Sequence, residues 1–277
     1  TVEKAGKTPI IIEFPASYPV EFRNGIHIGE YGSPSRAEKE VTFSKCFTTL
    51  DLQYADKVEL EPVEGWENIP VKVNKGLEFK MKIIPTAWEI GWPFTHPETI
   101  PNSRAFEYDA LVYSSKSNGY DTIAVCKDKD FSKCVVELQK GNYSDFIVEE
   151  FFVAGKIVKA AFRMKLIELS PDARRLRLYL SEVYPVDDFT FPSNLSKELF
   201  EHCGPYQPLI FQDLPVMKGW IDLETYKEET EYNLNWLAKC ASYLIKSKKW
   251  DLMMMKWHSP DHVKHSFWHL IDPVCHG

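Results

Sequence analysis

The sequence predicts an α/β fold that carries a large β-rich insertion of antiparallel strands. Two short apolar segments, residues 8–14 and residues 252–255, have the composition of strands buried on both faces. Between them, residues 38–185 contain recurring segments that alternate apolar and polar side chains, as antiparallel strands do. A long helical pattern covers residues 222–246. We therefore expect the two apolar strands to join one mainly parallel sheet, despite their distance in the sequence.

This pattern divides the chain into three parts. Residues 1–37 are expected to form the first part of an α/β core, and residues 38–185 the β-rich insertion. Residues 186–277 are expected to form a helical segment and the return to the core. With 277 residues, 44% hydrophobic and 26% charged, the composition is that of a globular protein with one large domain or two smaller ones.

Charge and hydropathy exclude some classes of function. The formal net charge is −7 and the chain has no long basic block, which argues against a dedicated nucleic-acid binder. No apolar run approaches the ~20 residues that a membrane span needs, so we expect no span. The sequence does not determine the compartment, although a cytoplasmic location is favoured. The six cysteines include no Cys-x-x-Cys motif, so buried free thiols are expected. Cys126 and Cys134 can face each other across a hairpin.

The N-terminal part has the pattern of a helix end, a strand and a rigid loop. Gly6 is expected to cap the helix end, because glycine favours the left-handed conformation found there. The strand at residues 8–14 is rich in isoleucine and is followed by a loop with Pro15 and Pro19. A second short strand is expected at residues 26–29. For Tyr18 and His27, packing is favoured over catalysis.

The β-rich part contains three candidate hairpin turns, at residues 117–119, 140–142 and 154–156. Each contains glycine, and two contain asparagine. Trp66, Trp88 and Trp92 lie in the stretch where strands are hardest to assign. They suit either a ligand platform or a hydrophobic core, and we favour the core.

The C-terminal part ends in a strand, a short turn and a helix. The helix is expected to begin near Pro260, with Ser259 or Asp261 as its cap, and to stop at Pro273. Phe267, Leu270 and Ile271 are expected to form its apolar side. In the preceding long helix, the charged run at residues 227–229 is interpreted as a solvated face.

Asp261 and His265 are the candidate metal ligands. They are four residues apart, so both side chains leave the same face of the helix, just past the carboxyl end of a strand. One carboxylate and one imidazole make half of a zinc-like site. His262 and His269 are interpreted as surface or capping residues. His258 is either a third polar group at the strand end or a turn residue.

The segment from Trp250 to Leu252, followed by residues 261–268, resembles the metal-site segment of the alkaline phosphatase superfamily. The most similar branch is that of the type I phosphodiesterases and nucleotide pyrophosphatases. Residues 141–146, 169–173 and 176–179 also resemble this branch. The resemblance implies an alkaline-phosphatase-like core sheet and hydrolysis of a small phosphate ester or nucleotide.

In that family, the aspartate and histidine of Asp-x-x-x-His bind one of two catalytic divalent metals, zinc or manganese. The resemblance assigns this role to Asp261 and His265. It also implies that the nucleophile and the remaining metal ligands lie outside residues 1–277. We therefore expect the chain alone to be catalytically inert.

A non-enzymatic β-rich module that binds a ligand or a protein is the alternative. The exposure of the two core strands is expected to discriminate between the enzyme and the binding module. Part of a larger enzyme should leave apolar faces exposed at residues 8–14 and 252–255, whereas a complete module should cover both strands.

Overall fold

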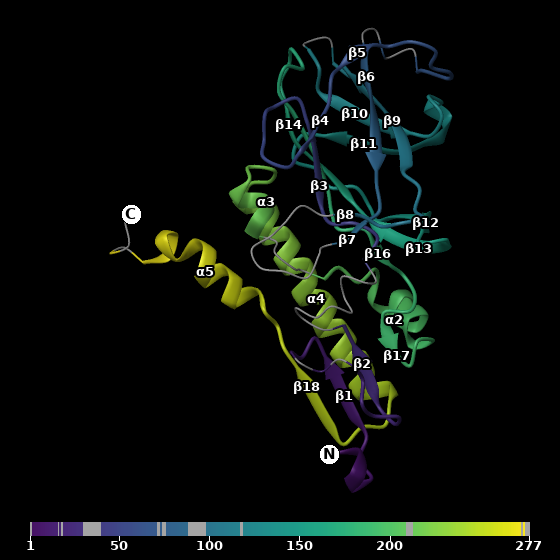
Figure 1. Ribbon diagram of the computed structural model, residues 1–277. Helices are drawn as coiled ribbons and strands as arrows, with labels where there is room; N and C mark the ends of the chain where they lie inside the picture. The colour runs from purple at the N-terminus through teal and green to yellow at the C-terminus, as the bar shows by residue number, and fades with distance from the viewer. Residues whose placement is uncertain are drawn as a thin grey trace.

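The computed structural model describes residues 2–15, 17, 19–29, 40–70, 73, 76–87, 98–116, 119–208, 213–272 and 274. Tyr18, Trp88, Trp92 and Pro273 lie outside the described residues, as does the expected boundary between residues 37 and 38. The fold is α/β, with helices and both mixed and antiparallel sheets (Figure 1). The division into three parts stays a prediction.

The helical elements lie at both ends of the chain and between the strands. They are η1 (Glu3–Ala5), η2 (Phe131–Lys133), α2 (Leu195–Cys203), α3 (Asp213–Met217), α4 (Leu223–Ser247) and α5 (Ser259–Ile271). The short 3₁₀ helix η1 ends at Gly6, whose φ of 70° confirms the expected left-handed cap.

A first, four-stranded sheet joins the two ends of the chain. Its order is β17 (Thr190–Phe191), β2 (Ile26–Ile28), β1 (Pro9–Ile12) and β18 (Leu252–Met255). The central strand β1 pairs in parallel with β2 and with β18, so that Ile10 lies opposite Ile26 on one side and Met253 on the other. Only β17 runs antiparallel. The expectation of one mainly parallel sheet is confirmed.

The prediction that β18 is buried on both faces is wrong. Ile10 and Ile12 in β1 are fully buried, whereas Leu252 and Met255 keep 36% and 45% of their surface exposed. The reason is that β18 forms an edge of this sheet, which its apolar composition does not reveal. Of the two core strands, β1 is covered and β18 exposes apolar side chains. The exposed apolar faces expected for part of a larger enzyme are therefore found at β18 but not at β1.

The remaining strands form the β-rich part, in the upper half of Figure 1. One sheet has the order β11 (Cys134–Gln139), β10 (Thr122–Cys126), β9 (Phe106–Tyr113), β6 (Gly76–Ile83), β5 (Glu61–Pro62), all antiparallel. A second has the order β14 (Met164–Leu169), β15 (Leu176–Leu180), β3 (Lys45–Thr48), β4 (Asp56–Lys57), and a third β12 (Ile147–Val153), β13 (Lys156–Phe162), β16 (Tyr184–Pro185). The short pair β7 (Thr86–Ala87) and β8 (Glu98–Thr99) completes the set. Apolar side chains from these sheets, among them Phe79, Phe151 and Leu178, share one core.

The three candidate turns have different outcomes. Ala154 and Gly155 join β12 to β13 with positive φ angles of 49° and 81°, as a two-residue hairpin turn requires. Residues 117–119 lie between the paired strands β9 and β10, although 117 and 118 are outside the described residues. The hairpin prediction at 140–142 is wrong, because β11 pairs with β10 and the next strand, β12, belongs to another sheet.

Helix α4 connects the small sheet to the β-rich part. Its 25 residues give it a length of about 37 Å, and Figure 1 shows it running from one part to the other. Asp222 caps its first turn by accepting a hydrogen bond from the backbone N–H of Thr225 at 2.8 Å. Toward its other end, Trp236, Leu237 and Leu244 pack with the buried isoleucines of β1 and β2.

The prediction of a solvated face at residues 227–229 is wrong for Glu229. Glu229 is fully buried and accepts a hydrogen bond from the guanidinium of Arg163 at 2.8 Å. Glu228 pairs with the ammonium of Lys165. Both basic side chains come from the β14 region, more than sixty positions away in sequence, so a local charge pattern does not reveal them. These ion pairs attach α4 to the β-rich part.

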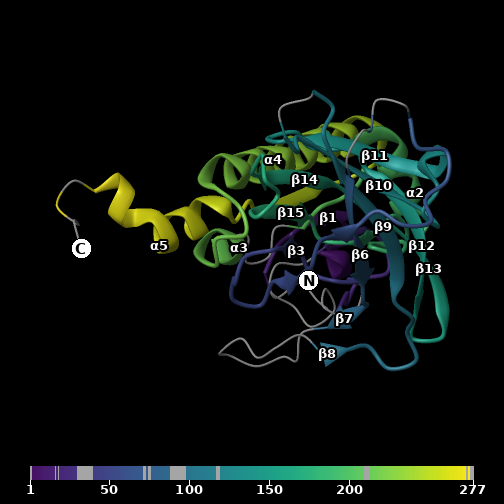
Figure 2. The ribbon, with the colours of Figure 1, turned by 90° about the horizontal axis from the view of Figure 1, so that it is seen from above.

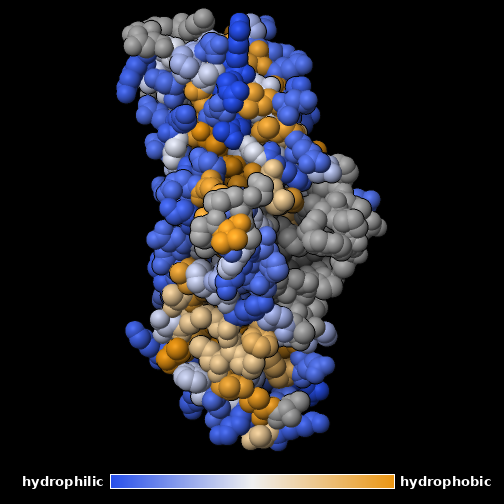
Figure 3. All heavy atoms as spheres, turned by 90° about the vertical axis from the view of Figure 1, so that its left-hand side faces the viewer, coloured by the Kyte–Doolittle hydropathy of each residue, from blue (hydrophilic) through white to orange (hydrophobic). Residues whose placement is uncertain are grey.

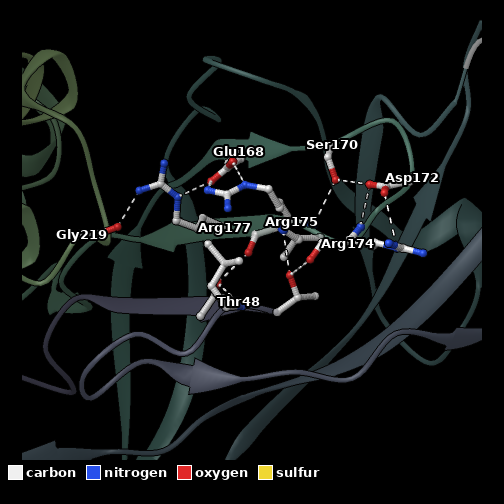
Figure 4. A network of polar contacts seen from close by, with 11 residues as sticks. Thr48, Glu168, Ser170, Asp172, Arg174, Arg175, Arg177 and Gly219 are labelled. Carbon is white, nitrogen blue, oxygen red and sulfur yellow. Dashed lines mark hydrogen bonds and ion pairs between the residues drawn. The ribbon is translucent and has the colours of Figure 1, made fainter.

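A second attachment lies at the β14–β15 hairpin (Figure 4). Glu168 in β14 accepts hydrogen bonds from Arg175 at 2.6 Å and from Arg177 at 2.9 Å. Arg177 also donates to the backbone carbonyl of Gly219, just before α4. The network therefore joins the hairpin to the corner that leads into the long helix.

Candidate metal-binding site

The candidate site lies at the turn between the end of β18 and the beginning of α5. The helix begins at Ser259, with Pro260 in its first turn, as the sequence predicted. Its N-cap residue is His258, and no side-chain hydrogen bond caps the helix, so the prediction of a cap by Ser259 or Asp261 is wrong. The backbone N–H of Lys256 donates to the carbonyl of Ile12, which keeps this turn against the carboxyl end of β1.

Asp261 and His265 lie side by side, as their spacing predicted. The Nε2 atom of His265 is 3.6 Å from Oδ1 of Asp261. The second carboxylate oxygen, Oδ2, is 3.1 Å from Nε2 of His258. The ring of His262 meets that of His258 edge to face, with centroids 5.0 Å apart. His258, which the sequence left open, thus belongs to the same cluster of polar side chains.

The two imidazole rings beside Asp261, those of His258 and His265, differ in their exposure to solvent. Burial, together with the positive charge of Lys256, lowers the pKa of His258 to about 4. Its imidazole is therefore neutral at pH 7, and a neutral ring that donates Nε2–H can hold the carboxylate of Asp261 in place. The side chain of His265 is 79% exposed, so it remains accessible from solvent.

The donor pair fits one metal ion. Two ligand atoms that each lie about 2.0–2.2 Å from one zinc, at a tetrahedral angle, are separated by about 3.3–3.6 Å. The 3.6 Å between Asp261 and His265 agrees with this spacing. Carboxylate and imidazole suit zinc and manganese alike. In the part of the chain that the structure describes, no group of three or more His, Cys, Asp or Glu side chains is arranged to hold one metal ion, so these residues supply a pair and not a complete site.

Phe267 and Val263 anchor α5 in a cluster that includes Val216 of α3 and Tyr226 of α4, and the helix otherwise projects from the body (Figure 2). Phe267 is 8% exposed and packs against Tyr226 of α4. Of the residues predicted to form the apolar side of this helix, Phe267 is buried, whereas Leu270 is 58% exposed. The helix is kinked at Phe267, where φ is −124°, and this departure from regular geometry alters which side chains face the body.

Both side chains of the Asp261–His265 pair are exposed on the surface. Asp261 keeps 54% of its side-chain surface, and His265 more. Figure 3 looks onto projecting α5, and an apolar patch occupies the lower half of the same face, where β18 lies. Trp250, Leu252 and Met255 are exposed in and beside β18.

A second pair of polar side chains lies at the same edge of the parallel sheet. The hydroxyl of Ser17, in the loop after β1, is 2.8 Å from Nε2 of His27 in β2 and also donates to the carbonyl of Phe14. His27 is 5% exposed, which agrees with the packing role favoured from the sequence. Sequence analysis did not find Ser17, because its proximity to His27 depends on the pairing of β1 with β2.

Comparisons with known proteins find no relative of this chain. No family model matches the chain, and neither the curated proteins nor the solved structures include a match. Among the described helices, none is long and apolar enough to cross a membrane.

Proposed function

We propose that this chain supplies one metal-ligand pair of a metal-dependent phosphohydrolase of the alkaline phosphatase type, acting on a phosphate ester or diester. Asp261 and His265 are the ligands in this proposal. The proposal assigns neither a nucleophile nor any further metal ligand among the described residues. The proposal rests on the resemblance of residues 250–268 to the metal-site segment of that superfamily.

A single structural observation carries the proposal furthest. A carboxylate and an imidazole lie 3.6 Å apart in the helix that directly follows a strand of a parallel sheet. Binding sites in open α/β sheets form at the carboxyl ends of such strands. An exposed Asp–His pair at an arbitrary surface position would lack this relationship to the sheet.

Each described residue has a distinct role in the proposal. When bound, divalent metal ions neutralise charge on the phosphoryl group and lower the pKa of the attacking group. Asp261 and His265 provide an oxygen and a nitrogen ligand. His258 is a positioning residue, because its Nε2 atom holds the second oxygen of Asp261 at 3.1 Å. Phe267 positions the helix through its contact with Tyr226.

The experiment is a titration of purified 1–277 with Zn²⁺ and, separately, with Mn²⁺. The imidazole signals are followed by NMR for Zn²⁺ and by paramagnetic broadening for Mn²⁺. We expect His265 to respond first, and Asp261→Asn to weaken that response at least tenfold. His202→Gln is the matched control, because this histidine stacks on Tyr243 in another part of the fold.

Two results of this titration would contradict the proposal. If His265 responds equally in the wild-type chain and in Asp261→Asn, the two side chains do not share an ion. If neither responds, the metal assignment falls. The alternative, a non-enzymatic binding module with an incidental histidine-rich end, then becomes the better account of the chain.

A further inference from the structure

Cys126 and Cys134 face each other across two antiparallel strands. They are partners in the pairing of β10 with β11, next to a register shift between Val125 and Cys126. Because Val125 pairs with Val136, the shift leaves one extra residue in β11, as a β-bulge does. The bulge therefore brings Cys134, rather than its neighbour, opposite Cys126. The sequence had left this arrangement as one possibility.

Opposite residues in antiparallel strands form either a hydrogen-bonded pair or a non-hydrogen-bonded pair, and the two side chains are closer in the second kind. The backbone N–H of Lys127 donates to the carbonyl of Lys133 at 3.3 Å, and this bond flanks the cysteine pair. The two cysteines are thus a non-hydrogen-bonded pair, for which the Cα atoms are about 4.5 Å apart and the side chains are nearest. That separation lies inside the range of about 4.4–6.8 Å that a disulfide spans.

The two thiols differ in exposure and in acidity. They are in hydrogen-bonding contact, and that contact lowers the pKa of Cys134. Cys134 is half-buried, whereas Cys126 is fully buried. A thiolate is the reactive form in disulfide exchange, so Cys134 is the thiol that a reagent in solution meets and Cys126 is the one behind it.

We propose that Cys126 and Cys134 are a modification site, which closes to an intramolecular disulfide when the chain meets a low-molecular-weight disulfide such as oxidised glutathione. The Cys134 thiolate attacks one sulfur of the reagent, forms a mixed disulfide and releases one thiolate. Cys126 then loses its proton and attacks the Cys134 sulfur, which expels the second thiolate. The two protein thiols are oxidised, the reagent is reduced to two thiols, and the two protons pass to them.

The bond links the edge strand of the five-stranded sheet to its neighbour. β11 is at one end of the order β11-β10-β9-β6-β5, so among the described strands of that sheet it pairs with β10 alone. Edge strands are the part of a sheet that opens most readily to other chains. The disulfide therefore locks this edge in place.

A second cysteine pair provides an internal comparison. Cys203 at the end of α2 and Cys240 in α4 also have thiols in hydrogen-bonding contact. Both are buried, with exposures of 7% and 0%. Because a reagent in solution does not reach either sulfur, we expect this pair to stay reduced in the folded protein under conditions that oxidise the first pair.

The experiment is peptide mapping after incubation of folded 1–277 with oxidised glutathione. Free thiols are blocked with N-ethylmaleimide, and the chain is cut with trypsin without reduction. Cleavage after Lys116, Lys127, Lys133 and Lys140 places the two cysteines on separate peptides, 117–127 and 134–140. Only a disulfide keeps these peptides together, as a species two hydrogen atoms lighter than their sum.

We expect the linked peptides to replace both alkylated peptides in the wild-type chain. In Cys126→Ser, glutathione should stay attached to Cys134, because the resolving thiol is gone. In Cys134→Ser, Cys126 should remain unmodified. Cys126→Ala and Cys134→Ala give the same readout if a serine hydroxyl disturbs the fold. Stable glutathione on wild-type Cys134, or two unlinked peptides at every reagent concentration, would overturn the proposal.

Discussion

The ring of Phe267 in α5 meets the ring of Tyr226 in α4 edge to face, with centroids 5.1 Å apart. Phe267 is nearly buried, while its neighbours Trp268 and Leu270 are 45% and 58% exposed. The helix that carries Asp261 and His265 is therefore attached to the body mainly on one side. Its position depends on a contact with a residue 41 positions earlier in the chain.

The first prediction concerns that attachment. We expect Phe267→Ala to destabilise the docked helix by about 3 kcal/mol, because the change removes a buried aromatic ring and leaves a cavity. The loss should be local, so backbone amides in α5 should exchange with solvent faster while those in β1 do not change. Leu270→Ala is the control, with an expected effect within about 0.5 kcal/mol, because Leu270 is exposed. Equal exchange in both variants would contradict the anchoring role.

The second prediction concerns the buried ion pair between Arg163 and Glu229. Arg163→Met removes the charged partner of a fully buried carboxylate, and such a loss destabilises a protein by about 3–5 kcal/mol. Chemical denaturation should detect this, and Arg163→Met combined with Glu229→Leu should recover most of the loss. Lys227→Met is the control, because Lys227 pairs with Glu224 on the exposed face. A double variant no more stable than Arg163→Met would argue against an unpaired charge as the cause.

The third prediction concerns pH. Partial burial disfavours the charged form of Glu168, but the ion pairs with Arg175 and Arg177 outweigh this effect and hold its pKa below the ordinary value. The stabilisation is therefore present above the unfolded-state pKa of about 4.3 and is lost as pH falls through the folded-state pKa. We expect Glu168→Gln to lower the free energy of unfolding at pH 7, with a difference that shrinks in acid. A difference for Glu168→Gln that stays constant from pH 7 into the acid range would contradict the linkage.

The fourth prediction compares two glycines with positive φ. Gly29, at the end of β2, has φ of 54°, and a Cβ atom there would lie 2.6 Å from the hydroxyl of Tyr206. Gly141 has φ of 88°, with no heavy atom within 4 Å of the corresponding position. Both alanine variants should lose about 1–2 kcal/mol through backbone strain. Gly29→Ala should lose roughly 1–3 kcal/mol more through overpacking, and thermal unfolding of the two variants measures that difference.

The fifth prediction is that purified 1–277 does not hydrolyse an aryl phosphodiester or an aryl phosphomonoester, with added Zn²⁺ or Mn²⁺. The reason is that phosphoryl transfer needs a positioned nucleophile and complete metal coordination, and Asp261 with His265 provide only part of the latter. Hydrolysis rates should match those of buffer with metal. Turnover that depends on metal and is abolished by Asp261→Ala would mean that these residues contain a complete site.

Local patterns in the sequence determined the elements and one side-chain pair. The apolar segments near both ends predicted the strands β1 and β18, and the helical period predicted α4. The pairing of β1 with β18 followed from their shared strand–loop character. Asp261 and His265 were predicted to lie together because a spacing of four residues places both on one face of any helix.

Only the tertiary structure decided which strands and side chains are buried and which distant residues they contact. The same apolar composition serves the covered strand β1 and the edge strand β18, because strand order is set by distant partners. Glu229 lies in a run of charged residues, yet its side chain is buried, because Arg163 from another part of the chain forms an ion pair with it. The turn after β18 lies against β1 because the backbone N–H of Lys256 donates to the carbonyl of Ile12, a contact between distant segments. A sequence pattern records what each side chain can do, whereas contacts between distant segments determine which of those possibilities is realised.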